Sequence, residues 1–327
     1  MIAIEISRFG GPDVLRPVER PKPVVRENEV LVAVKAAGVA HADTLQRQGK
    51  YPVPEGASDI PGMDLAGLIE AVGSEVEGWQ AGDAVCALTT GGGYAEFCSV
   101  PALQVLPIPA GWSFVEAATL PENMFTAYDN VITRGRLQAG ETILIHGGTS
   151  GVGYLAIMLS QAWRARPIAT AGNSLKCKAC IGFGASDAIN YRELDFVEEC
   201  KRLTTGRGVD VVLDMVGGAY LERNLDALAT EGRLAIIATQ KGSVAPMDLT
   251  KLMRKRISVF GSMLRSRTVE KKGVIATALL RDVWPLLPAK NVIWPVIDSL
   301  FPLEEAHLAH ERMESGQHIG KIVLVRA

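Results

Sequence analysis

The sequence predicts an α/β protein of two domains, one built on a doubly wound parallel sheet and one rich in short β-strands. The chain has 327 residues, which at about 150 residues per domain corresponds to roughly two domains. Strand-like and helix-like segments alternate between residues 122 and 262, as in parallel sheets covered by helices on both faces. The first 120 residues instead contain short apolar runs interrupted by glycine and proline, which is typical of a barrel or sandwich.

In the first domain, we expect strands at residues 29–39 and 64–73 and within residues 83–100. Ser113 is placed to cap a helix that contains Glu116 and Ala117. The strand-like C-terminal segment 320–327 is expected to rejoin this domain.

In the second domain, each apolar strand is followed by a segment with helical character. The expected strands are 141–147, 166–172, 185–191, 208–217 and 232–238, and the expected helices are 152–163, 174–184, 195–204 and 219–230. The stretch 142–163 has no formally charged residue, but its glycine-rich centre favours a strand, a loop and a helix over a membrane span.

Composition excludes several classes of protein. Lys plus Arg number 34 and Asp plus Glu number 36, giving a net charge of −2, so a basic nucleic-acid-binding surface is not indicated. The five cysteines are scattered, and the first residues lack a signal-peptide pattern, so we expect a cytoplasmic protein without disulfides. Glycine is in excess, because it makes up 33 of the 327 residues, about one in ten against an average of roughly 7%. This excess predicts many tight turns.

One of these turns has the features of a dinucleotide-binding loop. Gly148, Gly151 and Gly153 lie between an expected strand and an expected helix, with Ser150 in place of the usual middle glycine. Backbone N–H groups at such a helix start bind phosphate, so Ser150, Gly151 and Val152 are expected to contact a pyrophosphate. The alternative is a tight connection without a ligand. Val152 excludes the G-x-S-x-G nucleophile elbow.

The end of the next strand favours NADPH over NADH. NAD-binding proteins usually place an acidic residue there to bind the ribose 2′-hydroxyl, but no acid occurs between Thr170 and Lys176. An uncharged turn of Gly172, Asn173 and Ser174 followed by Lys176 suits a 2′-phosphate. Alternatively, Lys176 is an ordinary exposed helix lysine.

Several further segments carry a resemblance to a known family. They are FGGPDVL, VLVAVKAAGVAHADTLQRQGKYP, GWQAGDAV, GASDAINYRELDF, GSMLRSR and FPLEEAHLAHERMESGQHIGKIVLV. With the glycine loop, they resemble the zinc-independent, zeta-crystallin-like quinone oxidoreductases of the medium-chain dehydrogenase/reductase superfamily, most of all the tumour-suppressor-induced branch. This resemblance implies a GroES-like catalytic domain of residues 1–121 and 263–327 and a Rossmann NADPH-binding domain of residues 122–262.

The resemblance also bears on metal binding. Related zinc alcohol dehydrogenases carry a Cys where this chain has Ala40 and a His where it has Met63, and the cysteine-rich lobe of a structural zinc is missing. No metal is therefore expected. Cys177 and Cys180 form an isolated pair within an expected helix, for which we predict helix packing rather than metal or redox use.

Further site residues follow from the resemblance. Tyr51 matches a tyrosine that the family places at the mouth of the nicotinamide pocket, and Thr126 matches a family segment that borders the nicotinamide ribose; both are catalytic candidates. The other implied cofactor contacts are His41, Asp43, Tyr128, Tyr191, Val216, Ala238, Thr239, Met263 and Leu264. The alternatives are loop packing of Tyr51 and His41, a helix-cap role for Asp43, and core packing of Thr126, Tyr128, Met263 and Leu264. Ala40, Ile237 and Ala238 depart from the family's common Asn, aromatic residue and Gly.

The resemblance implies an NADPH-dependent quinone reductase. A reductase of α,β-unsaturated carbonyls is the first alternative, and an NADPH-binding structural or RNA-binding protein is the second. The β-prone segment 256–264 lies where relatives pair edge strands across a two-fold axis, so we expect a homodimer.

Overall fold

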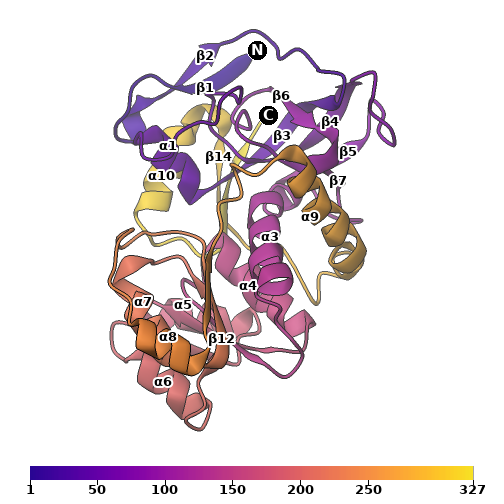
Figure 1. The fold of residues 1–327 in the computed structure, drawn as a ribbon. Helices are drawn as coiled ribbons and strands as arrows, with labels where there is room; N and C mark the ends of the chain where they lie inside the picture. The colour runs from indigo at the N-terminus through magenta and orange to yellow at the C-terminus, as the bar shows by residue number, and fades with distance from the viewer. Residues whose placement is uncertain (327) are drawn as a thin grey trace. The chain divides into compact units, whose positions relative to one another are not determined.

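The chain forms two compact units in a computed structural model, which describes residues 1–326 (Figure 1). The first unit combines Met1–Phe125 with Leu264–Ala327, and the second comprises Thr126–Met263. Each unit has its own sheet and its own buried core.

The second unit is built on a parallel sheet of six strands in the order β10-β9-β8-β11-β12-β13. This is the Rossmann strand order, with the reversal point between β8 and β11. The strands are β8 (Thr142–Ile145), β9 (Arg166–Ala171), β10 (Asp187–Asn190), β11 (Val209–Asp214), β12 (Leu228–Ile236) and β13 (Ser258–Gly261). The predicted α/β class and its parallel sheet are confirmed.

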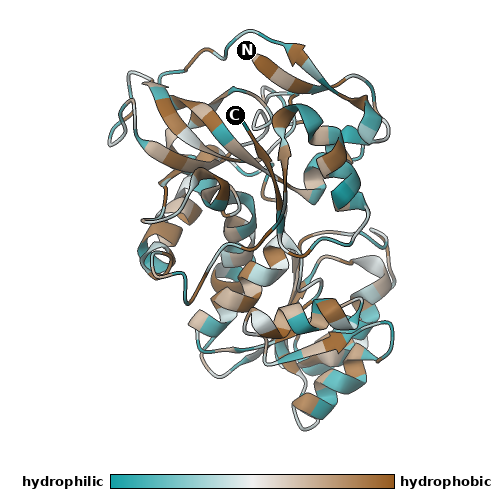
Figure 2. Cartoon of the chain, turned by 180° about the vertical axis from the view of Figure 1, so that it is seen from behind, coloured by the Kyte–Doolittle hydropathy of each residue, from teal (hydrophilic) through white to brown (hydrophobic). Residues whose placement is uncertain are grey.

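The helices of this unit connect consecutive strands. They are α4 (Gly151–Ala162), α5 (Ser174–Gly182), α6 (Phe196–Leu203), α7 (Leu221–Ala227) and α8 (Leu249–Lys255), with a π-helical segment, η3, at Tyr128–Arg134. Helices with a brown side and a teal side are visible in Figure 2, as expected for helices that bury one face and expose the other.

One predicted boundary in this unit was wrong. The helix expected over 219–230 ends at Ala227, and β12 begins at Leu228. Leu228 pairs with Val209 of β11, after which the register shifts. Glu231 has a φ of 64° next to a glycine, so a bulge and not a helix occupies this segment.

The first unit is built on a mainly antiparallel sheet. Its path is β14-β15-β3-β4-β5-β7, with β6 also paired to β3, and a separate hairpin joins β1 to β2. The strands are β1 (Ile2–Ile6), β2 (Leu15–Glu19), β3 (Glu29–Val39), β4 (Asp64–Val72), β5 (Ala84–Leu88), β6 (Phe97–Pro101), β7 (Val105–Pro107), β14 (Ile297–Pro302) and β15 (Lys321–Val325). The expected return of the C-terminal strand is confirmed, because β15 pairs with β3.

Five helices accompany this sheet or link it to the next unit. They are α1 (His41–Arg47), α2 (Phe114–Ala117), α3 (Pro121–Ala127), α9 (Val269–Asp282) and α10 (Ala306–Glu314). Ser113 caps α2 in a capping box with Glu116, as predicted. The hairpin of β1 and β2 and the helices α9 and α10 were not anticipated from the sequence.

A buried ion pair connects β4 and β15 of the first unit across β3. Lys321 Nζ lies 2.6 Å from Asp64 Oδ2, and both side chains are almost fully buried. Burial opposes the charge of Lys321, but the neighbouring carboxylates, Asp64 foremost, together outweigh burial and raise the pKa of Lys321. A Cβ atom at Gly38 of β3 would lie within 3 Å of both side chains. Glycine in this strand therefore makes room for the ion pair.

Within residues 1–326, no helix combines the length and apolar character needed to cross a membrane. The charge-free stretch 142–163 forms β8, the glycine loop and α4, as predicted.

Candidate cofactor and active site

The glycine loop joins β8 to α4 at the carboxyl edge of the parallel sheet. Gly147 has a φ of 66°, which an L-residue rarely adopts. A Cβ atom at Gly148 would lie 2.7 Å from both Ala169 Cβ and Cys180 Sγ, and one at Gly153 would lie 2.2 Å from the Gly147 carbonyl oxygen. These glycines therefore allow strand, loop and helix to pack without side chains between them.

The loop presents backbone donors at the start of α4. Ser150 is the N-cap, and its hydroxyl accepts a hydrogen bond from Gly153 N at 3.0 Å. The N–H groups of Gly151 and Val152 have no acceptor among residues 1–326. Free donors and the positive end of a twelve-residue helix form a site that suits a pyrophosphate.

We expect Gly153→Ala to weaken NADPH binding by about tenfold or more, equivalent to roughly 1.4 kcal/mol. The added methyl group would displace the Gly147 carbonyl and with it the loop donors. Gly182→Ala is the matched control, because nothing lies within 4 Å of its Cβ position. Fluorescence titration with NADPH measures both variants, and equal affinities would contradict the assigned role of the loop.

A basic corner lies beside this loop, where β9 and β10 end. Asn173 caps α5 by accepting a hydrogen bond from Lys176 N at 2.8 Å. A Cβ atom at Gly172 would lie 2.8 Å from Tyr191 Oη and 3.5 Å from Arg192 Nε. Tyr191 and Arg192 therefore fold over the Gly172 turn that precedes Lys176. Of these, Tyr191 is 42% exposed, which leaves its ring accessible.

Arg192 was missed in the sequence analysis. Among residues 1–326, no carboxylate lies within ion-pair distance of its guanidinium. A signal for it existed, because it follows the strand expected at 185–191, and carboxyl ends of neighbouring parallel strands meet at one edge. Asn190 pairs with Ala171, so the residues that follow these two strands lie next to each other.

Two later turns border the same edge. Val216 follows β11, and Ala238 and Thr239 follow β12, as predicted. Gly217 packs against the second turn, since its Cβ position is 2.6 Å from Thr239 Cα.

Asp214, which the sequence analysis also missed, holds the first of these turns. Its carboxylate accepts hydrogen bonds from Val216 N at 2.7 Å and Gly217 N at 3.2 Å. Burial raises the pKa of Asp214 to about 6, against the opposing effect of these hydrogen bonds. At neutral pH, the carboxylate is mostly ionised and available to both backbone donors.

In the first unit, Tyr51 lies after α1 beside a fixed arginine. The guanidinium carbon of Arg265 is 5.3 Å from the centre of the Tyr51 ring, within the range of a cation–π contact. Arg265 Nε donates to Thr90 O at 2.8 Å. Burial and the negative charge of Glu122 raise the pKa of Tyr51, and Arg265 opposes them. The phenol therefore stays protonated at neutral pH and can donate a hydrogen bond.

His41 and Asp43 take different places at the start of α1. His41 is exposed. Asp43 is buried, and its carboxylate accepts from Ala40 N at 2.8 Å, Gly62 N at 3.1 Å and Tyr94 Oη at 3.3 Å. Asp43 therefore fits the helix-cap alternative. Its buried carboxylate is not accessible for the cofactor contact that the resemblance implies.

The remaining candidates lie near the limits of the units. Thr126 accepts a hydrogen bond at its carbonyl from Asn130 Nδ2 at 2.9 Å. Tyr128 is buried, with its ring edge-on to Trp163 at 6.1 Å, which agrees with the core-packing alternative. Met263 is 58% exposed and Leu264 is half-buried, so neither is a core residue of its own unit.

The positions compared with zinc ligands carry other residues. Ala40 caps α1, and Met63 is buried. Cys177 and Cys180 lie on α5, as predicted, and burial raises the pKa of the Cys180 thiol to about 12. Within residues 1–326, no three His, Cys, Asp or Glu side chains form a group that could hold a metal ion.

Comparisons with known proteins decide the family. Residues 26–110 match the alcohol dehydrogenase GroES-like domain, which confirms the predicted GroES-like fold, and residues 151–279 match the zinc-binding dehydrogenase family. A quinone oxidoreductase of Lama guanicoe is 34% identical over 99% of this chain and 97% of its own. The chain belongs to the zeta-crystallin-like quinone oxidoreductases of the medium-chain dehydrogenase/reductase superfamily.

Solved structures agree with this assignment. The quinone oxidoreductase of Escherichia coli in complex with NADPH superposes with a TM-score of 0.87, at 32% identity, over 99% of this chain and all of that chain. The CurK enoyl reductase superposes equally well, with a TM-score of 0.87 at 29% identity over 100% of this chain and 99% of that chain. One of these two similar structures is thus a quinone oxidoreductase and the other an enoyl reductase.

Proposed function

We propose that this chain is an NADPH-dependent quinone reductase. The observation that carries the proposal is its full-length similarity to quinone oxidoreductases, one of which was solved with NADPH. We assign cofactor binding to residues 122–262 and acceptor binding to the GroES-like domain of residues 1–121 and 263–327.

The residues of the second unit fit NADPH. The free N–H groups of Gly151 and Val152 would bind the pyrophosphate, with Ser150 holding the helix start. Lys176 and Arg192 would bind the 2′-phosphate above the turn of Gly172, Asn173 and Ser174, because charge-assisted hydrogen bonds to phosphate are the strong ones. Tyr191 would flank the adenine end, and the turns of Val216, Ala238 and Thr239 would complete the carboxyl edge.

The chemistry needs little activation of the acceptor. NADPH supplies a hydride from C4 of its nicotinamide. Reduction of a quinone gives a resonance-stabilised hydroquinone anion, so positioning and the exclusion of water can do most of the work. In this proposal, Tyr51 donates a hydrogen bond to an acceptor oxygen, Thr126 and His41 border the cofactor, and Met263 and Leu264 close over it.

We expect Tyr51→Phe to lower kcat/KM for quinones by roughly tenfold to a hundredfold, since a hydrogen bond to a developing charge contributes about 1.5–3 kcal/mol. NADPH affinity should change little. Steady-state oxidation of NADPH with 1,2-naphthoquinone and 9,10-phenanthrenequinone, set against a panel of enones, measures this effect and the acceptor preference together. An unchanged kcat/KM would remove Tyr51 from the proposed machinery.

A second candidate function is the reduction of an activated carbon–carbon double bond. The similarity to an enoyl reductase favours it, and higher kcat/KM for enones than for every quinone would establish it. The third reading is an NADPH-binding structural or RNA-binding protein. It predicts tight NADPH binding without oxidation by any acceptor.

We also propose a homodimer in the cytoplasm. β13 is an edge strand of the six-stranded sheet and pairs only with β12 among the described residues. Such an edge can pair with a second copy of itself. A monomer mass in light scattering would contradict the dimer.

A further inference from the structure

The first unit contains a cavity that the proposed reaction does not use. Its volume is about 500 Å³, within the usual range for small-molecule sites of roughly 300–1,000 Å³. It is formed by the loop of residues 54–60, the turn of residues 89–92, strand β6 and the segment from Arg265 into α9. Tyr51 does not line it.

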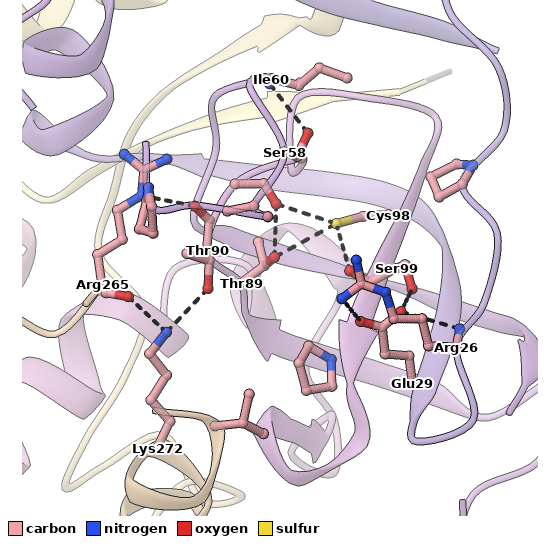
Figure 3. A pocket seen from close by; sticks show the side chains of 18 of the residues that line it. Arg26, Glu29, Ser58, Ile60, Thr89, Thr90, Cys98, Ser99, Arg265 and Lys272 are labelled. Carbon is pink, nitrogen blue, oxygen red and sulfur yellow. Dashed lines mark hydrogen bonds and ion pairs between the residues drawn. The ribbon is translucent and has the colours of Figure 1, made fainter. Parts of the chain in front are cut away.

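Two buried cations occupy one side of this cavity. In Figure 3, Arg265 and Lys272 lie together around Thr90, on the side opposite Arg26 and Glu29. Lys272 is 2% exposed and Arg265 is 4% exposed. Lys272 Nζ donates to Thr90 Oγ1 at 3.1 Å and to Arg265 O at 3.0 Å. Both cations are thus held in place by the same short turn.

Neither cation has a carboxylate partner within ion-pair distance among residues 1–326. One terminal nitrogen of Arg265, Nη2, is buried without any hydrogen-bond acceptor. Burial and the charge of Arg265 lower the pKa of Lys272 to about 8. Burying two like charges side by side is unfavourable unless an anion compensates them.

The acids near the cavity do not supply that anion. Glu55 lines the cavity, but it is exposed and makes no ion pair with either cation among residues 1–326. Glu29 lies on the opposite side of the cavity. Its carboxylate accepts a hydrogen bond from Ser99 Oγ at 2.5 Å and forms an ion pair with Arg26. Asp43 acts on Arg265 only at longer range, since its oxygens bind Ala40, Gly62 and Tyr94. The remaining lining mixes apolar side chains, among them Pro23, Val24, Ile60, Phe97 and Pro101, with polar ones such as Asn28, Ser58 and Ser266.

We propose that this cavity binds a small organic anion, whose carboxylate or phosphate group pairs with Lys272 and Arg265 and whose apolar body lies against the proline, valine and phenylalanine side chains. Lysine and arginine recognise both groups through charge-assisted hydrogen bonds. The site is additional to the proposed quinone reductase activity and does not depend on it. Arg265 lines this cavity and also contacts the Tyr51 ring. The Arg265 side chain would therefore lie between a bound anion and Tyr51.

Isothermal titration calorimetry of the full chain at pH 7 tests the proposal with benzoate, phenyl phosphate and neutral benzamide. We expect saturable binding of at least one anion and none of benzamide. Lys272→Met should weaken that binding about tenfold or more. Lys271→Met, on the exposed face of the same helix, should leave it unchanged. The anion that binds more tightly identifies the ligand group.

A thermal melt shows whether Lys272→Met is folded. If Lys272→Met is unfolded, Lys272→Arg replaces it in the titration, and this variant should retain binding because it keeps the charge. Three results would overturn the proposal: no binding of either anion at millimolar concentration, equal binding of benzamide, or equal affinity in wild type and Lys272→Met.

Discussion

Lys321→Met is expected to lower the free energy of unfolding by about 3–5 kcal/mol, because removing one partner of a buried ion pair leaves an uncompensated charge. The stranded group would be the Asp64 carboxylate, which is fully buried and whose other oxygen accepts from Glu122 N. The pair also links β4 to β15 across β3, so its loss would loosen the sheet that carries α1 and Tyr51. Urea denaturation followed by circular dichroism measures the change.

Two controls separate the buried charge from other effects. Asp13→Asn removes a surface partner of Arg8, whose own side chain is 76% exposed, and should change stability by no more than about 0.5 kcal/mol. The double variant Asp64→Leu/Lys321→Met should lose less than the sum of the single variants, since no charge remains buried. Additive losses would show that the ion pair itself contributes nothing.

The double variant Lys176→Ala/Arg192→Ala is expected to lose the preference for NADPH over NADH. Each cation should contribute roughly 1.5–3 kcal/mol to binding of a phosphate dianion, so the ratio of kcat/KM for NADPH to that for NADH should fall about a hundredfold or more. NADH lacks the 2′-phosphate, and its own kcat/KM should change little. Steady-state rates with both cofactors measure the ratio.

Lys178→Ala is the matched control for this variant. Lys178 lies on the same helix, is exposed and should leave the ratio unchanged. The single variant Arg192→Ala is the sharper test, because the assignment of Arg192 rests on the structure, in which its side chain packs against Gly172. If it leaves the ratio unchanged while Lys176→Ala lowers it, the 2′-phosphate is bound by Lys176 alone.

The sequence was sufficient for features that depend on local pattern. The alternation of apolar strands and helices located β8 to β12, and the chain order of glycines located the loop before α4. The preference for NADPH could also be predicted locally, from the absence of an acidic residue in the turn around Asn173. The residue that binds the ribose follows its strand at a fixed distance in the sequence.

Features that depend on distant partners could not be derived in this way. Asp64 and Lys321 are 257 residues apart, and Arg265 contacts Tyr51 only because the chain re-enters the first unit at Leu264. Asp43 matches a family position but is buried by Tyr94 and the Gly62 turn, which lie beyond its own helix. The bulge that ends α7 early depends on pairing with β11, so local helix propensity could not predict it.

The most direct test of the central claim is anaerobic oxidation of NADPH by 1,2-naphthoquinone in the presence of the full chain. We expect saturable turnover that forms one hydroquinone for each NADPH consumed, with kcat/KM for NADH lower by about tenfold or more. Tight NADPH binding without oxidation by any quinone, or an equal rate with NADH, would contradict the account.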